Sequence, residues 1–198
     1  MAKSFLLHLD DVGASAGSVI AWKALRAAGV VRSASVMVPC AYYRFAIEDY
    51  LEDNAQDLGI HVTLTSEWSR YRWRPLTGPV AGLVDGEGYF HRRPEAVAAN
   101  ADPDAVEDEM AAQIERALSD GIRPTHIDAH MGTAFLPQFI ERLWKLADRY
   151  RLPLPVCRDM IRLFDIVRMH GLDLGYFREV LAEAERRRDP VFETFFIG

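Results

Sequence analysis

The sequence has few cysteines, no excess of positive charge and no long apolar run. The two cysteines, Cys40 and Cys157, stand apart without a CxxC pair, so we expect both to be reduced in a cytoplasmic protein. No apolar run approaches the length that crosses a membrane, and Met1–Ser4 leads into a short apolar strand, so neither a signal peptide nor a membrane anchor is expected. The net charge of −6 argues against binding to nucleic acid or to anionic membranes.

What the sequence does have is a regular alternation of strand and helix signals. An apolar fraction of 49% over 198 residues predicts a single domain, 1–198, with a sizeable core. We expect strands at Ser4–Leu9, Ser33–Val38, Leu58–Leu64, Thr125–Ala129, Leu154–Cys157 and Val191–Ile197. We expect helices at Ser15–Ala28, Tyr42–Asn54, Pro103–Asp120, Pro137–Tyr150 and Leu174–Arg187.

One stretch, 66–102, breaks the alternation with several prolines and glycines, and predicts a long insertion with a hairpin turn at Asp85–Gly88. Elsewhere the alternation predicts an α/β fold with parallel strands and outer helices. The strand count falls short of eight, so we expect an irregular or incomplete (β/α) barrel that resembles a TIM barrel. An open doubly wound sheet is the alternative, and both folds place their chemistry at the carboxyl ends of the strands.

Two adjacent aspartates, Asp10 and Asp11, follow the first apolar strand. Neighbouring carboxylates repel each other, so the pair implies a cation or a proton between them. If the strand continues, the two side chains point to opposite sides, and one can face a metal while the other faces a water molecule. The alternative is a solvated pair that caps the following helix.

Histidines at two later strands supply further metal ligands. His61 stands in one β-rich run, and His126, Asp128 and His130 share one face of another because side chains alternate along a strand. One carboxylate and two imidazoles make an open metal site, with Asp128 or His126 orienting a ligand. A buried core histidine is the alternative interpretation of His61, and His8 is either a wall of the site or a core residue.

Aromatic residues and arginines alternate just after His61. Aromatic faces suit sugar rings and arginine suits carboxylate or phosphate, so this run predicts substrate binding by Trp68, Tyr71, Arg72 and Trp73. A packed surface loop is the alternative, as is a subunit contact, on which the expectation of a homodimer rests.

Five segments together resemble the YdjC/ChbG/HpnK-type carbohydrate deacetylases, in the family's order and spacing over residues 4–137. The segments are Asp10–Gly13, Val31–Val38, Gly59–Thr65, Leu83–Phe90 and Pro124–His130. The resemblance implies a barrel-like fold and hydrolysis of an N-acetyl group from a sugar. It also implies that Asp11, His61 and His130 hold one divalent metal ion, Mg²⁺ or Zn²⁺, with Asp10 as the general base.

The sequence departs from the family at two places. Many members continue after the ligand histidine with further histidines, whereas this chain continues with Met131–Phe135, so a different substrate is expected. The late His-Pro that is thought to serve as the acid has no counterpart here. The acid is then missing, lies outside this sequence, or is another group, of which His126 or His8 is the candidate.

Three functions remain in view. The first is a metal-dependent hydrolase that removes the N-acetyl group of an amino sugar or short oligosaccharide, with a small carbohydrate as its partner. The second is another metal-dependent barrel enzyme, a phosphoester hydrolase or sugar isomerase, which Arg70, Arg72 and Arg74 would favour. The third is a non-catalytic carbohydrate-binding relative.

Overall fold

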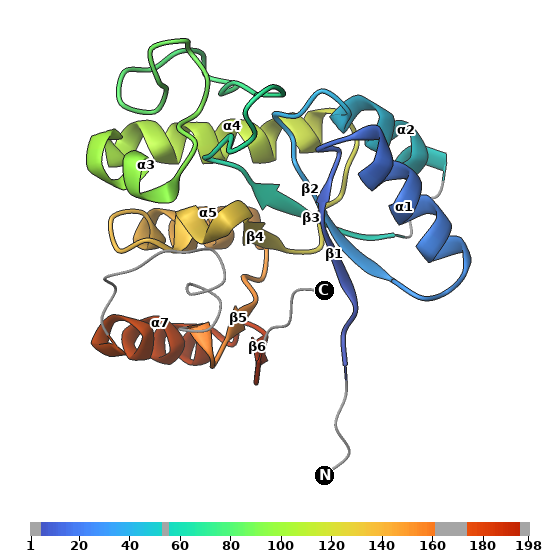
Figure 1. Cartoon of the computed structure of the whole chain (residues 1–198). Helices are drawn as coiled ribbons and strands as arrows, with labels where there is room; N and C mark the ends of the chain where they lie inside the picture. Colours follow the sequence, from blue (N-terminus) through green and yellow to red (C-terminus); the bar gives the residue numbers. More distant parts are fainter. Residues whose placement is uncertain (1–4, 53–55, 161–173, 195–198) are drawn as a thin grey trace.

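The computed structural model describes residues 5–52, 56–160 and 174–194. The strands are β1 (His8–Val12), β2 (Ser33–Val36), β3 (Asp57–Val62), β4 (Ile127–Ala129), β5 (Val156–Cys157) and β6 (Val191–Phe192). The helices are α1 (Ala16–Ala27), α2 (Tyr43–Glu52), α3 (Pro94–Asn100), α4 (Pro103–Ser119), the 3₁₀ helix η1 (His130–Phe135), α5 (Ile140–Tyr150) and α7 (Leu174–Arg187). Figure 1 shows α1 and α2 side by side next to β1 and β2, with α4 and α5 on the other side of the strands.

The first four strands form one parallel sheet in the order β1-β2-β3-β4, and β5 and β6 pair in parallel separately. Neighbours in the chain are therefore neighbours in the sheet, as in a singly wound barrel. A doubly wound sheet reverses its strand order, and the described strands show no reversal. The α/β fold with parallel strands is thus confirmed.

The sheet must also curl. In a flat sheet, β1 and β4 would lie about 14 Å apart, because adjacent strands are spaced by about 4.8 Å. Yet Nδ1 of His130, directly after β4, lies 2.9 Å from Oδ1 of Asp11 in β1. Nε2 of His8 in β1 lies 3.4 Å from Oδ2 of Asp128 in β4. These contacts require the curvature of a barrel wall, with one side of the sheet facing inward.

Most predicted elements are present with shifted ends. The main correction concerns the first strand, which spans His8–Val12 and not Ser4–Leu9. Residues 1–4 lie outside the described part of the chain, as do 195–198 at the predicted end of the last strand. The later start places both Asp10 and Asp11 inside β1. Phe5, Leu6 and Leu7 are exposed and precede the strand.

The 66–102 insertion contains a helix that the sequence did not predict. α3 covers Pro94–Asn100 and begins with proline in its first turn, a position where the missing N–H costs nothing. The predicted turn at Asp85–Gly88 is confirmed, since the N–H of Asp85 donates to the Tyr89 carbonyl and Val84 pairs with Phe90.

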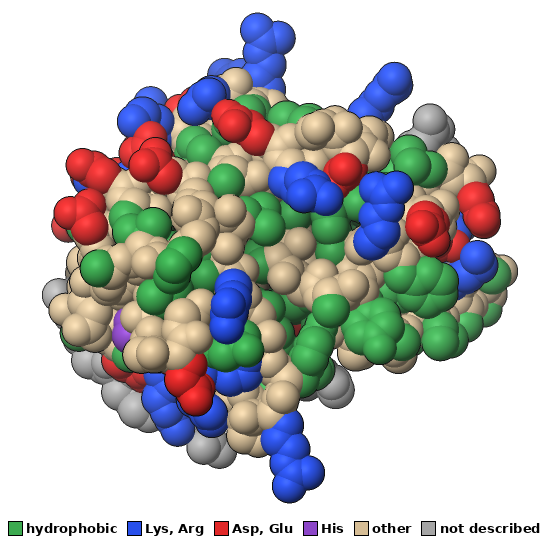
Figure 2. Space-filling view, turned by 90° about the horizontal axis from the view of Figure 1, so that it is seen from above, with side chains coloured by type: hydrophobic (Ala, Val, Ile, Leu, Met, Phe, Trp, Pro, Cys, Tyr) green, Lys and Arg blue, Asp and Glu red, His purple; other side chains and the backbone are tan. Residues whose placement is uncertain are grey.

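Several exposed apolar side chains lie on α1 and α2. Hydrophobic side chains gather at the right of Figure 2, where α1 and α2 lie in Figure 1. Ile20 of α1, and Phe45 and Leu51 of α2, are among the exposed ones. None of the described helices is long and apolar enough to cross a membrane.

The insertion is held to α4 by the buried carboxylate of Glu109. It accepts hydrogen bonds from the backbone N–H groups of Leu76 and Thr77 and from the Thr77 hydroxyl, at 2.8–3.1 Å. Burial raises the pKa of Glu109, while these donors oppose the shift.

Next to Glu109, the side-chain amide of Gln113 bonds the backbone of Thr63, directly after β3, as a neighbouring strand would. Its Oε1 accepts from the N–H of Thr63 at 2.9 Å, and its Nε2 donates to the Thr63 carbonyl at 2.7 Å and to Glu109 at 2.8 Å. Gln113 is fully buried. One amide thus satisfies two backbone groups just beyond the end of β3 and fixes the course of the chain after His61.

Replacing Gln113 by alanine leaves these buried groups of Thr63 without partners and opens a cavity. We expect the free energy of unfolding to fall by about 2–4 kcal/mol, measured by denaturant unfolding. Gln113→Glu, which keeps the acceptor and loses the donor, is expected to lose stability too. The exposed Gln138→Ala is the matched control, and an equal effect there would contradict the role of Gln113.

Candidate metal centre

The inner side of the curled sheet is polar where a barrel interior is commonly apolar. Because side chains alternate along a strand, every second residue faces this interior. The inward set comprises His8 and Asp10 on β1, Ser33 and Ser35 on β2, Gly59 and His61 on β3, and His126 and Asp128 at β4. Four strands thus supply a cluster of histidines, carboxylates and hydroxyls.

At the carboxyl ends of these strands, Asp11 meets two buried histidines. Its Oδ1 lies 2.9 Å from Nδ1 of His130 and 3.2 Å from Nε2 of His61. The structure therefore brings together the three residues for which the sequence resemblance implied metal binding. All three ligand atoms lie within 4.8 Å of one another.

The backbone of Asp11 explains how its carboxylate reaches both rings. Its φ of 61° lies in the left-handed region, which costs free energy for a residue other than glycine. The pairing of β1 with β2 also shifts register between Leu9 and Val12. The sequence predicted that Asp10 and Asp11 point to opposite sides, and this is wrong: both carboxylates lie beside the His61 imidazole. The positive φ interrupts the simple alternation of a strand.

The neighbouring opposite charges favour the charged forms of Asp11, His61 and His130. Burial alone would raise the pKa of Asp11, but hydrogen bonds from His130 and His61 hold it well below its usual range. Burial alone would lower the pKa of both histidines. Asp128 and Asp11 raise that of His61, and Asp11 and Glu67 raise that of His130. These oppositely charged groups compensate one another in a place where an isolated charge would be costly.

The other nitrogen of each histidine is held by a second carboxylate. Nδ1 of His61 lies 2.7 Å from Asp128 Oδ1, with the Ser35 hydroxyl at 3.1 Å, and Nε2 of His130 lies 3.1 Å from Glu67 Oε2. A carboxylate behind an imidazole fixes the ring and its tautomer, as it does for metal-binding histidines. Asp128 thus contacts a histidine of this group, and its orienting role stays a prediction. Glu67 was missed, since no periodic pattern links it to His130.

This donor set fits a divalent cation. Asp11 Oδ1, His61 Nε2 and His130 Nδ1 are one oxygen and two nitrogen donors, and each imidazole keeps a hydrogen-bonding partner on its far side. A site with three protein ligands leaves positions for water and substrate.

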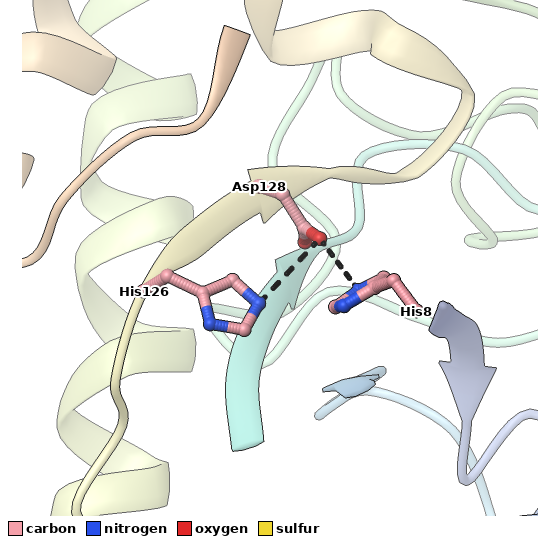
Figure 3. Close-up of side chains that lie close together, drawn as sticks. All are labelled: His8, His126 and Asp128. Atoms are coloured by element: carbon pink, nitrogen blue, oxygen red, sulfur yellow. Dashed lines mark ion pairs between the residues drawn. The ribbon is translucent and has the colours of Figure 1, made fainter. Parts of the chain in front are cut away.

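A second inward group is formed by His8, His126 and Asp128 (Figure 3). Burial alone would lower the pKa of His8, but Asp10 and Asp128 raise it to about 9. Burial lowers the pKa of His126 and so favours its neutral form. His126 was predicted from the sequence as the proton donor. The His126 ring is not part of the Asp11 group. It packs against the backbone of β3 at Gly59.

The aromatic residues after His61 lie together. The ring centroids of Trp68, Tyr71 and Trp73 are 5.5–5.8 Å apart, and Trp73 is 6.2 Å from His130. Trp73 is buried and Trp68 is exposed. An aromatic surface therefore extends from the candidate metal centre to solvent.

Arg72 does not join this aromatic surface. Its guanidinium donates to Asp85 Oδ2 and to the Phe90 carbonyl, both at 2.6 Å. It is nearly buried and lies over the Tyr89 ring. These contacts fix the insertion and match the packed-loop alternative for this residue.

Comparisons with known proteins agree with this architecture. A model of the YdjC-like protein family matches residues 4–194. A carbohydrate deacetylase of Thermus thermophilus is 39% identical over 147 residues, which are 74% of this chain and 51% of that protein. One of Brevibacillus brevis is 33% identical over 148 residues, 75% of this chain and 57% of that protein. This chain therefore spans little more than half the length of these two relatives.

A solved structure shows the same fold. It comes from Enterococcus faecalis V583 and is described as a cellobiose-phosphate cleavage protein. The TM-score is 0.70, with 22% identity over 98% of this chain and 81% of that chain. At this identity the likeness concerns the fold alone.

The position of His126 depends on Gly59. A Cβ at residue 59 would lie 2.3 Å from Nε2 of His126 and 2.4–2.6 Å from two ring carbons. We therefore expect Gly59→Ala to displace the His126 ring and to lower the free energy of unfolding by about 1–3 kcal/mol, measured by denaturant unfolding. Gly86→Ala is the control, because a Cβ at Gly86 meets no atom within 4 Å. Equal stability of the two variants would show that the interior is not packed as described.

Proposed function

This chain belongs to the YdjC-like protein family, and we propose that it removes the N-acetyl group of an amino sugar or short oligosaccharide with one divalent cation, Mg²⁺ or Zn²⁺. The observation that carries the proposal is the convergence of Asp11, His61 and His130 beside the carboxylate of Asp10. Relatives named carbohydrate deacetylases support the reaction class.

In this proposal, Asp11, His61 and His130 hold the cation. When bound, the cation polarises the amide carbonyl and acidifies water. Asp128 and Glu67 keep the two imidazoles oriented, which leaves Nε2 of His61 and Nδ1 of His130 facing Asp11. Three ligands from the ends of three strands therefore need little rearrangement to bind the ion.

Asp10 is the proposed general base. Its carboxylate lies next to Asp11 in the chain and within reach of His61 and Asp128, and it is half-buried. It can therefore take a proton from a water molecule at the same centre without being one of the three ligands. The proton donor to the leaving amine, predicted from the sequence as His126, stays a prediction.

Trp68, Tyr71 and Trp73 are the proposed sugar-binding surface. Trp68 offers an exposed ring, and Trp73 connects it to His130. Aromatic faces stack on the apolar faces of sugar rings. This surface would place an acetamido group of the bound sugar toward the cation.

The phosphoester alternative is less well supported. It depended on arginines that are free to bind a phosphate. Arg72 is occupied by Asp85 and the Phe90 carbonyl, and Arg74 stacks on Tyr89 at 4.4 Å. Both of these guanidinium groups therefore serve the insertion, whereas the third arginine of that prediction, Arg70, is exposed.

The test is release of acetate from N-acetylated chitooligosaccharides, before and after removal of metal with a chelator. We expect Asp10→Asn to keep the cation and to lower the rate by about 100-fold or more, because the general base is lost. We expect His130→Ala to lose the cation as well. Metal content is measured by elemental analysis.

The exposed Asp108→Asn is the control and is expected to keep both the rate and the cation. If Asp10→Asn loses the cation instead, the roles of Asp10 and Asp11 are exchanged. If the wild-type chain binds the cation and releases no acetate from these substrates, the proposed reaction is wrong.

A further inference from the structure

A second set of donor atoms lies deeper in the curled sheet. Nε2 of His8 and Nε2 of His126 lie 3.4 Å and 4.0 Å from the same oxygen, Asp128 Oδ2. Figure 3 shows both imidazoles pointing at this carboxylate from opposite sides. All three atoms lie within 4.8 Å of one another, and none of them belongs to the Asp11, His61 and His130 group.

His126 leaves its inner nitrogen without a partner. Its Nδ1 lies 2.9 Å from the Thr125 hydroxyl and 3.5 Å from Asp57 Oδ1. These oxygens place the ring proton on Nδ1 and a lone pair on Nε2. That Nε2 is buried and has no hydrogen-bond partner among the described residues, and the side chain is only 10% exposed. A buried lone pair without a donor is costly.

Nε2 of His8 is in the opposite situation, because it has more neighbouring oxygens than one N–H can bond well. Three oxygens surround Nε2: Asp10 Oδ1 at 3.2 Å, the Ser35 hydroxyl at 3.2 Å and Asp128 Oδ2 at 3.4 Å. A single N–H can point directly at only one of these oxygens, and the distances exceed the roughly 2.7–2.9 Å of a good charged hydrogen bond. Nδ1 of His8 is already paired with the Ser33 hydroxyl at 2.9 Å.

We infer that His8, His126 and Asp128 bind a second divalent cation of the zinc class. A cation would bind the lone pair on Nε2 of His126. It would also take the place of the proton on Nε2 of His8, which faces three oxygens. In a tetrahedral zinc site with bonds of about 2.0–2.1 Å, ligand atoms are about 3.3 Å apart. The observed 3.4 Å already matches this spacing. The 4.0 Å separation, and the nitrogens of His8 and His126, which lie within 4.8 Å of each other, require the His126 ring to close toward Asp128 and His8.

Asp128 would connect the two centres. Its Oδ2 faces His8 and His126, while its Oδ1 holds Nδ1 of His61 at 2.7 Å. Ser33 and Thr125 hold the outer nitrogens of His8 and His126, as expected for metal-binding imidazoles. His126 would then be a ligand, a different role from the proton donor predicted from the sequence. The inference goes beyond the proposed function and does not require deacetylation.

The test is the Zn²⁺ stoichiometry of the whole chain, measured by elemental analysis after metal removal, reloading with excess Zn²⁺ and desalting. We expect two equivalents in the wild type. We expect one in His126→Phe, which keeps the ring volume over Gly59, and one in His8→Asn. We also expect one in Asp11→Asn, where the second site remains. The retained equivalent in each variant shows that the chain is folded.

His91→Phe is the matched control, because Nε2 of His91 is paired with the Gly82 carbonyl in the insertion, and it should keep two equivalents. Saturation of the wild type at one equivalent would overturn the inference, as would two equivalents in both His8→Asn and His126→Phe. Failure of the proposed function is distinguishable: acetate release would be absent while two equivalents are bound.

Discussion

The contact of one carboxylate, that of Asp11, with two buried histidines is the constraint on which the rest of this structure depends. The partners follow β3 and β4, and the distances of 3.2 Å and 2.9 Å can be reached only if the sheet curls. The left-handed φ of Asp11 is part of the same constraint, since it turns the carboxylate toward both rings. A strained backbone at a cluster of charged groups is typical of functional sites.

The interior of the curled sheet is polar because the buried imidazoles at this contact are accompanied by further carboxylates. Each buried imidazole at the Asp11 group has a carboxylate on both sides: Asp11 and Asp128 flank His61, and Asp11 and Glu67 flank His130. Removing one member would leave a buried charge without its partner, which costs more than the pair contributes to stability. This agrees with the proposal that the cluster serves ligand binding, while the surrounding apolar core supplies stability.

Much of this could be predicted from the sequence, for identifiable reasons. The alternation of apolar runs predicted the order of strands and helices, and period-two spacing predicted that His126 and Asp128 share one face. The same spacing does not hold for His130, which follows β4 as the first residue of η1. The grouping of Asp11, His61 and His130 came from the resemblance. Glu67, Ser35 and Gly59 could not be predicted, because their roles arise from contacts between distant segments. The short helix α3 was hidden by the prolines and glycines around it.

The most direct test of the account is anomalous diffraction from crystals loaded with Zn²⁺, recorded on both sides of the zinc absorption edge. The account predicts a peak at bonding distance from Asp11 Oδ1, His61 Nε2 and His130 Nδ1, with Asp128 and Glu67 still holding the far nitrogens of the two rings. Fully loaded crystals without a peak at this position, or with His61 and His130 turned away from Asp11, would contradict it.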